Sequence, residues 1–148
     1  MIIRDILADK GSQIYSVAPD TSVADAVALM IAKDISSVLV LRGGAMAGLV
    51  TLREVLRGLH RLGPKLPGVP VSEIMVVSPV IGHPDDSVDR MRQTMTENHV
   101  THLPVLENGR LVGILSFQDV ARWMVKDVAL ENQMLKQYIK HWPDERRD

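Results

Sequence analysis

Cysteine is absent from this chain of 148 residues, so neither disulfide bonds nor thiolate chemistry can contribute to its structure or function. Long apolar runs are absent too, because no stretch approaches the roughly 20 residues that a membrane-spanning helix needs. The N-terminal residues MIIRDILADK lack the apolar core of a signal peptide. From these absences we expect a cytoplasmic protein that has no membrane partner.

Aromatic residues and charge of one sign are scarce. The chain has two Trp, two Tyr and one Phe, so a flat ligand would be held mainly by aliphatic side chains and backbone groups. The formal net charge is -1, and Lys and Arg do not gather in any stretch, whereas a nucleic-acid-binding protein normally has a basic patch. Neither a Walker loop nor a G-x-S-x-G nucleophile motif is present. We therefore expect no nucleic-acid partner, no catalytic residues and no enzymatic activity.

What the chain does contain is an internal repeat. The stretch GLVTLRE at residues 48–54 recurs as GILSFQD at residues 113–119. The same offset of 65 positions, measured from Thr51 to Ser116, aligns residues 16–57 with residues 81–122 without a gap. A register kept over this length indicates a duplicated unit.

Both copies predict the same order of elements. A Pro-Asp pair followed by Ser22 or Ser87 is typical of a helix start, and apolar residues at helical spacing come next. Two apolar runs then flank a turn, Gly-Gly in the first copy and Asn-Gly in the second, which is typical of a β-hairpin. A second helix begins at the hydroxyl residue, Thr51 or Ser116. We also expect a short strand before each copy, around residues 14–17 and 80–81. The predicted fold class is therefore α/β (α+β), with two β-α-β-β-α repeats.

The repeat divides the chain into four parts. Residues 1–62 form the first repeat, residues 63–70 are a linker rich in Pro and Gly, and residues 71–125 form the second repeat. Residues 126–148 form a C-terminal helical extension and tail. A helix that begins at about Phe117 in the second repeat is expected to continue into this extension and to end near Trp142, before Pro143. The apolar stripe of this helix has two interpretations: packing against its own domain, or a subunit interface.

The hydroxyl-x-x-carboxylate pattern in each motif also has two interpretations. Thr51 with Glu54, and Ser116 with Asp119, form capping boxes, which alone would explain both pairs. The same geometry also suits a ribose phosphate. Free amides at a helix start bind phosphate, a carboxylate can accept from the two ribose hydroxyls, and an upstream glycine lets a ligand approach the backbone.

With HLPVLENGRLVGILS between residues 102 and 116, the two copies resemble a tandem pair of CBS domains, also known as a Bateman module. They look most like small stand-alone bacterial CBS-domain proteins. This resemblance implies two repeats related by a pseudo-twofold axis, two clefts between them and a homodimer. It also implies a regulatory module that binds AMP, ADP, ATP, NAD or S-adenosylmethionine and reports to a separate effector protein. The alternative is a ligand-free dimerisation or scaffolding protein in which both motifs are only helix caps.

The resemblance also implies which residues form the site. Asp119 would hold the ribose and Ser116 the phosphate or ribose, and the second repeat ranks first because Glu54 departs from the aspartate of the family. The second-repeat set is Gly113, Ser116, Asp119, Ser78, Val80, Ile81, Val100, Thr101 and His102. The first-repeat set is Gly48, Thr51, Glu54, Ile14, Tyr15, Ser16, Ile35, Ser36 and Ser37. Lys10, Arg53 and Arg122 are the phosphate candidates.

Two histidines, His99 and His102, have a spacing that suggests a metal site. No Cys is present to join them, and His102 precedes Leu-Pro at the start of an expected strand instead of lying on a helix. We therefore predict no metal site. We also expect no required cofactor, because the adenosine nucleotide would act as a regulatory ligand.

Overall fold

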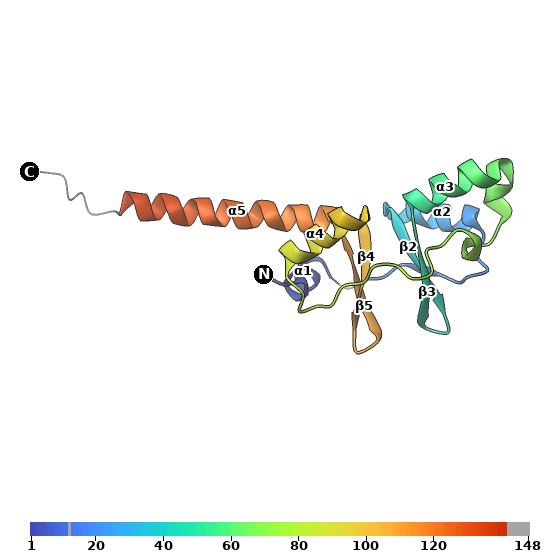
Figure 1. The fold of residues 1–148 in the computed structure, drawn as a ribbon, viewed down its shortest axis with the longest axis horizontal. Helices are drawn as coiled ribbons and strands as arrows, with labels where there is room; N and C mark the ends of the chain where they lie inside the picture. Colours follow the sequence, from blue (N-terminus) through green and yellow to red (C-terminus); the bar gives the residue numbers. More distant parts are fainter. Residues whose placement is uncertain (12, 142–148) are drawn as a thin grey trace, which may run out of the picture.

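The computed structural model describes residues 1–11 and 13–141. Figure 1 shows two small units side by side, each with a β-hairpin and covering helices, and a long C-terminal helix that projects away from them. This architecture confirms the mixed α/β fold with two repeats. The elements are α1 (Ile3–Lys10), β1 (Ser16–Val17), α2 (Val23–Lys33), β2 (Ser37–Arg42), β3 (Ala45–Thr51), α3 (Leu52–Leu62), the 3-10 turns η1 (Gly63–Gly68) and η2 (Val71–Glu73), α4 (Val88–Asn98), β4 (His102–Glu107), β5 (Arg110–Ser116) and α5 (Phe117–Lys140).

The two predicted hairpins are confirmed, and their registers are equivalent. Ser37 pairs with Thr51 at the open end of β2 and β3, and His102 pairs with Ser116 at the open end of β4 and β5. Both turns need backbone in the left-handed region, which Gly43 and Gly44 adopt readily. Each hairpin therefore delivers its hydroxyl residue to the start of the following helix.

The short first strand forms only in the first repeat. There β1 runs parallel to β2, and the Leu39 amide donates to the Tyr15 carbonyl oxygen. The second repeat has a single bridge, between Gly82 and Val105, so the strand expected at residues 80–81 is wrong. The reason is that the residue equivalent to Leu39 is Pro104, which has no N–H to extend the pairing.

The hydrophobic core of each repeat is completed by the segment that precedes the other repeat. Ile3 and Ile6 of α1 are fully buried in the core of the second repeat. Leu66, Val71 and Ile74, which follow α3, are buried in the core of the first repeat. The unit that repeats in the sequence is therefore not the unit that packs, because the segment before each repeat covers the core of the other one.

Two apolar faces remain uncovered. On α3, Glu54 and Gly58 are buried, whereas Leu52, Leu56 and Leu59 are each more than half exposed. The start of α5 packs through the buried Val120, but its apolar residues from Met124 onward are exposed. Packing of the extension against its own domain is therefore wrong for the described residues. The expected end of the helix near Trp142 lies outside them, as does the tail.

The α5 helix is long but not apolar enough for a membrane. None of the helices in the described ranges combines the length and hydropathy that crossing a bilayer requires.

Candidate functional site

The start of α3 carries the first hydroxyl-x-x-carboxylate pair. Thr51 is the N-cap residue, and its Oγ1 accepts from the Arg53 amide at 3.3 Å. The Thr51 amide donates to Glu54 Oε2 at 3.0 Å, and the Thr51 hydroxyl donates to the same oxygen. The capping box is thus formed through Oε2. Within residues 1–11 and 13–141, Glu54 Oε1 accepts no hydrogen bond.

A cavity of about 310 Å³ opens beside this helix start. Segments of both repeats line it: the end of β3 and the first turn of α3 from the first repeat, and two loops from the second. The half-buried Val76, Val80 and Val100 form its apolar wall. Its lining comprises Leu49, Thr51, Arg53, Glu54, Arg57, Val76, Ser78, Pro79, Val80, Asn98, His99, Val100, Thr101 and His102.

This grouping crosses the repeats, in contrast to the expected sets. Ser78, Val80 and Val100 were expected beside Ser116 and Asp119, but they share the cavity with the first-repeat pair instead. Backbone hydrogen bonds explain the placement. The Leu49 amide donates to the Val76 carbonyl oxygen at 3.0 Å, and the Val76 amide donates back at 2.9 Å. The chain after Val76 therefore runs along the edge of β3 and reaches the start of α3.

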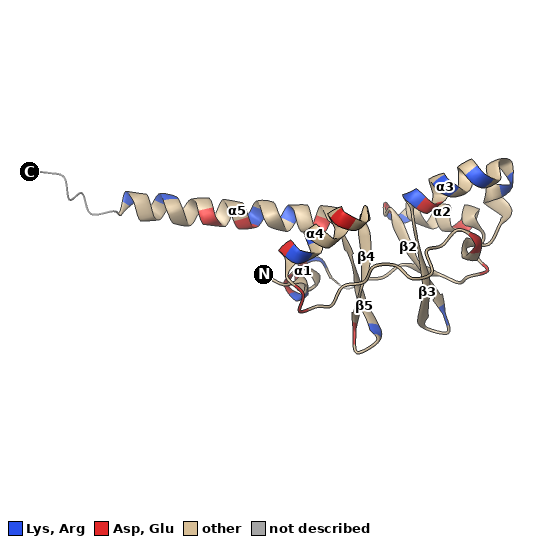
Figure 2. Cartoon of the chain, in the orientation of Figure 1, with Lys and Arg blue, Asp and Glu red and all other residues tan. Residues whose placement is uncertain are grey.

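The α3 helix carries three arginines at one-turn spacing: Arg53, Arg57 and Arg61. Figure 2 shows basic residues along this helix. Arg53 donates from Nη1 to the His99 carbonyl oxygen at 2.6 Å, across the mouth between the repeats. Arg57 lines the cavity as well. Arg57, Asn98 and His99 were not among the predicted site residues. The 65-residue offset could have found Arg57, because its equivalent Arg122 was a phosphate candidate.

The start of α5 carries the second pair in a different electrostatic setting. Asp119 Oδ2 accepts from the Ser116 amide at 3.0 Å and from Lys10 Nζ at 2.6 Å. Arg122 Nη1 lies 3.9 Å from the other oxygen, Oδ1. Burial alone would raise the pKa of Asp119, but the hydrogen bonds from Lys10 and Ser116 outweigh it and hold the pKa below its ordinary value. Lys10 also donates to the Ile114 carbonyl oxygen at 2.8 Å, so α1 is tied to this helix start.

The two motif glycines are both covered by the protein itself. An added Cβ at Gly48 would lie 2.6 Å from Met75 Sδ and 2.8 Å from the Val76 carbonyl oxygen. At Gly113 it would lie 2.8 Å from the end of the Leu7 side chain. Both glycines therefore make room for the preceding apolar segment, and neither of them lines the cavity.

The other residues of the first-repeat set, which were expected beside Thr51 and Glu54, are not among those that line the 310 Å³ cavity. Ile14 and Ser16 line a groove near the two hairpin turns, and Tyr15 lies with Lys33 Nζ 5.6 Å from its ring centroid. Ile35 packs against the first core, and Ser37 is buried. Of the second set, Ile81 is exposed and is not among the residues that line the 310 Å³ cavity.

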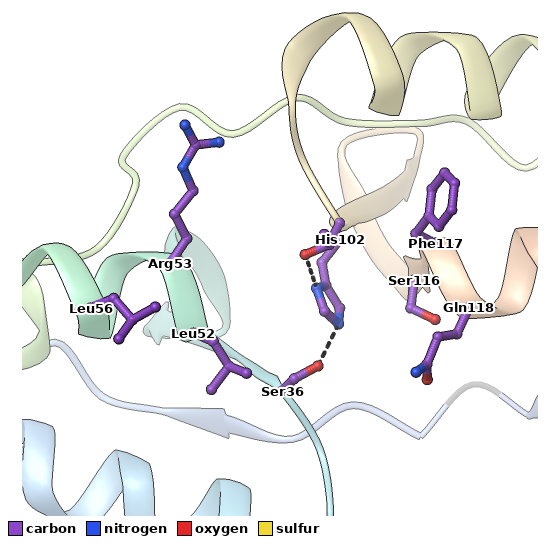
Figure 3. A pocket seen from close by; sticks show the side chains of 9 residues that line it. Ser36, Leu52, Arg53, Leu56, His102, Ser116, Phe117 and Gln118 are labelled. Atoms are coloured by element: carbon purple, nitrogen blue, oxygen red, sulfur yellow. Dashed lines mark hydrogen bonds between the residues drawn. The ribbon is translucent and has the colours of Figure 1, made fainter.

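His102 connects the two repeats (Figure 3). Its Nε2 lies 3.1 Å from the Ser36 hydroxyl of the first repeat, and its Nδ1 lies 2.9 Å from the Thr101 hydroxyl. Burial, with the nearby Lys10 charge second, lowers the pKa of His102 below its ordinary value. His102 borders both the cavity described above and a groove of about 430 Å³ between the starts of α3 and α5.

Both repeats match the same protein-family model. The CBS domain model matches residues 3–61 and again residues 71–126. This chain belongs to the CBS-domain family. The two matches confirm the tandem pair of CBS domains that the internal repeat indicates, and they leave residues 62–70 between them.

Known proteins match most of the length of this chain. The mitochondrial CBS domain-containing protein CBSX3 of Arabidopsis thaliana is 31% identical over 148 residues, which cover 93% of this chain and 71% of the relative. A signal-transduction protein with CBS domains from Burkholderia ambifaria is 34% identical and superposes with a TM-score of 0.81, covering 86% of this chain and 96% of that structure. CBSX2, solved in complex with AMP, is 25% identical with a TM-score of 0.70, covering 84% and 96%.

Proposed function

We propose that this CBS-domain pair is a regulatory module that binds an adenine nucleotide in the cavity at the start of α3. One observation carries the proposal: a single cavity combines a helix start, a carboxylate oxygen that no described residue contacts by a hydrogen bond, two arginines and an apolar wall. The cavity volume of about 310 Å³ lies at the lower end of the range for small-molecule sites. The complex of CBSX2 with AMP supports the same ligand class.

The chemistry of the lining suggests how the nucleotide lies. Amides at the start of α3 and the Arg53 guanidinium favour a phosphate at that end. Glu54 Oε1 can accept from the ribose hydroxyls while Oε2 keeps the helix cap. The adenine then packs against Val76, Val80 and Val100, where aliphatic surface replaces the aromatic rings that the chain lacks.

Ligand binding here would act on the arrangement of the two repeats. The ligand contacts α3 of the first repeat and the loops before α4 and β4 of the second, so it favours the arrangement that makes both sets of contacts. Such a shift requires different affinities for the two arrangements. We propose that a separate effector protein responds and that the module itself catalyses no reaction. The cytoplasmic location stays a prediction.

A ligand-free scaffold is the second candidate, and one observation favours it. Both capping boxes are fully formed, so each hydroxyl-x-x-carboxylate pair already has a structural role. Asp119, the carboxylate of the second pair, also forms an ion pair with Lys10.

Thermal unfolding with added nucleotides separates the two candidates. The purified protein is heated with and without millimolar AMP, ADP, ATP, NAD or S-adenosylmethionine, with GTP as the purine control. A ligand at about a hundred times its dissociation constant stabilises the fold by roughly 2.7 kcal/mol. Glu54→Ala and Asp119→Ala form a matched pair, because each removes one capping carboxylate.

The sensor predicts that an adenine compound shifts the midpoint of the wild type and of Asp119→Ala but not that of Glu54→Ala. Each shift is measured against the same variant without ligand, which cancels the stability lost with the cap. No shift with any adenine compound would favour the scaffold.

We further propose that the module forms a homodimer through the groove between the starts of α3 and α5. Leu52, Leu56 and Phe117 line this groove and expose much of their apolar surface (Figure 3). An exposed apolar surface of this kind is typical of a protein interface. Light scattering after gel filtration should give a dimer for the wild type and a monomer for Leu56→Asp. A monomeric wild type at high concentration would contradict the proposal.

A further inference from the structure

Arg57 lies between two adjoining cavities. It lines the 310 Å³ cavity together with Thr51 and Glu54, and it also lines a neighbouring cavity of about 350 Å³ with Arg61. Glu54 and Val76 belong to both linings, so the two spaces meet along one side of α3. A ligand that starts at the helix N-terminus can therefore continue past Arg57.

Arg57 differs from the other two arginines of this helix. Arg53 donates to the His99 carbonyl oxygen, and Arg61 donates from Nη2 to the Glu73 carbonyl oxygen at 2.9 Å. Arg57 makes no hydrogen bond or ion pair with any residue of the described part of the chain. Its guanidinium therefore keeps all its donors available.

The second repeat provides the contrast that explains this. Arg122, the equivalent residue on α5, lies 3.9 Å from Asp119 Oδ1. Glu54 instead turns back to Thr51 through Oε2, so the carboxylate one turn ahead of Arg57 does not neutralise it. The same position thus holds a paired arginine in the second repeat and, among the residues that the structure describes, an unpaired arginine in the first.

We propose that Arg57 makes this cleft selective for adenosine ligands that carry a pyrophosphate. The inference rests on the proposed nucleotide site. The first phosphate binds at the start of α3 beside Arg53, and the second binds Arg57, four residues or about 6 Å further along the helix. A guanidinium can hold a phosphate through two parallel N–H···O bonds. AMP lacks the second phosphate, and S-adenosylmethionine lacks both and carries a positive charge, so both bind more weakly.

Calorimetric titration of the full chain with AMP, ADP and NAD tests this inference. Because hydrogen bonds to charged groups contribute about 1.5–3 kcal/mol, the wild type should bind ADP about tenfold or more tightly than AMP. Arg57→Gln should lose this preference, because it weakens the binding of ADP by a larger factor than the binding of AMP. Arg122→Gln is the matched control and should keep the preference. Arg57→Lys should fall between, because lysine retains the charge without the bidentate geometry.

The outcomes separate the inference from the function on which it rests. If the wild type binds AMP and ADP equally, or if Arg57→Gln weakens both by the same factor, the pyrophosphate selectivity is overturned and the nucleotide site stands. Binding of none of the three ligands would overturn both. ADP and NAD share the pyrophosphate, so tight binding of ADP but not NAD would identify a nucleotide with a free phosphate end, and the reverse a dinucleotide.

Discussion

The starts of α3 and α5 share one sequence pattern and one capping box, but their charges are arranged in opposite ways. At α5, Asp119 is enclosed by cations, with Lys10 Nζ at 2.6 Å and Arg122 Nη1 at 3.9 Å. At α3, Glu54 has no cationic partner among the described residues, and Arg57 has no anionic one. The carboxylate of the second motif is therefore neutralised by neighbouring cations, whereas the start of α3 leaves groups of both signs available to a ligand.

The difference originates in the segments that precede the repeats. Before the second repeat, the chain passes from Met75 to Val76 and pairs directly with β3. Before the first repeat, α1 continues to Lys10, whose side chain reaches the start of α5. In the 65-residue register Lys10 corresponds to Met75, so one connection brings an ammonium group to Asp119 where the other has an apolar side chain, and no ammonium group of the described residues pairs with Glu54.

The largest effect that distinguishes the two repeats is expected at the motif glycines. In Gly48→Ala the new methyl group would meet the Val76 carbonyl oxygen, which is fixed by its bond to the Leu49 amide. In Gly113→Ala it would meet only the flexible end of Leu7. Overpacking should therefore destabilise Gly48→Ala by about 2–3 kcal/mol and Gly113→Ala by about 1 kcal/mol, as measured by urea unfolding. Equal losses of stability would show that the segment at Val76 moves aside as easily as the Leu7 side chain does.

A smaller difference is expected from the two carboxylates. Asp119→Asn removes the partner of the half-buried Lys10, whereas Glu54→Gln keeps an acceptor for the helix cap and strands no cation. We expect losses of about 1–2 kcal/mol for Asp119→Asn and about 0.5 kcal/mol for Glu54→Gln at neutral pH. Urea unfolding at pH 7 measures both, and a larger loss for Glu54→Gln would contradict a stabilising ion pair between Asp119 and Lys10.

The pH dependence of the Asp119 effect follows from its pKa. Because the folded state holds the pKa of Asp119 below the ordinary value of 3.8, its contribution is fully present above 3.8 and is lost as the pH falls through the folded value. The stability difference between wild type and Asp119→Asn should therefore be constant near neutral pH and shrink in acid. A difference that persists unchanged in acid would mean that Asp119 contributes by packing alone.

The sequence alone predicted the features that depend on local pattern. The 65-residue repeat, the hairpins with their glycine turns, and the helix starts at Thr51 and Ser116 are encoded by residues close together in the chain. The partners of each helix start could not be predicted, because Ser78 reaches Thr51 through backbone pairing between Leu49 and Val76. The exposure of Leu52, Leu56 and Leu59 on α3 could not be predicted either, because it depends on the packing that turns Glu54 and Gly58 inward.

The smallest effect is expected at the junction between the repeats, where equivalent positions are occupied by Ser37 and His102. Only His102 titrates, and burial lowers its pKa below the ordinary value of 6.5. As the pH falls, the unfolded chain takes up a proton on His102 before the folded protein does. The contribution of His102 to stability is therefore fully present above pH 6.5 and declines as the pH falls from there toward the folded pKa.

The pH dependence of the wild type alone does not isolate His102, because Glu54, Lys10 and Asp119 all act on this imidazole. The difference between wild type and His102→Gln isolates its contribution, because glutamine can keep a hydrogen bond to Ser36 without titrating. Urea unfolding from pH 8 to pH 5 should show wild type losing stability relative to His102→Gln below about 6.5. Parallel curves would mean that the imidazole is as easily protonated in the folded protein as in the unfolded chain, and that the junction is open to water.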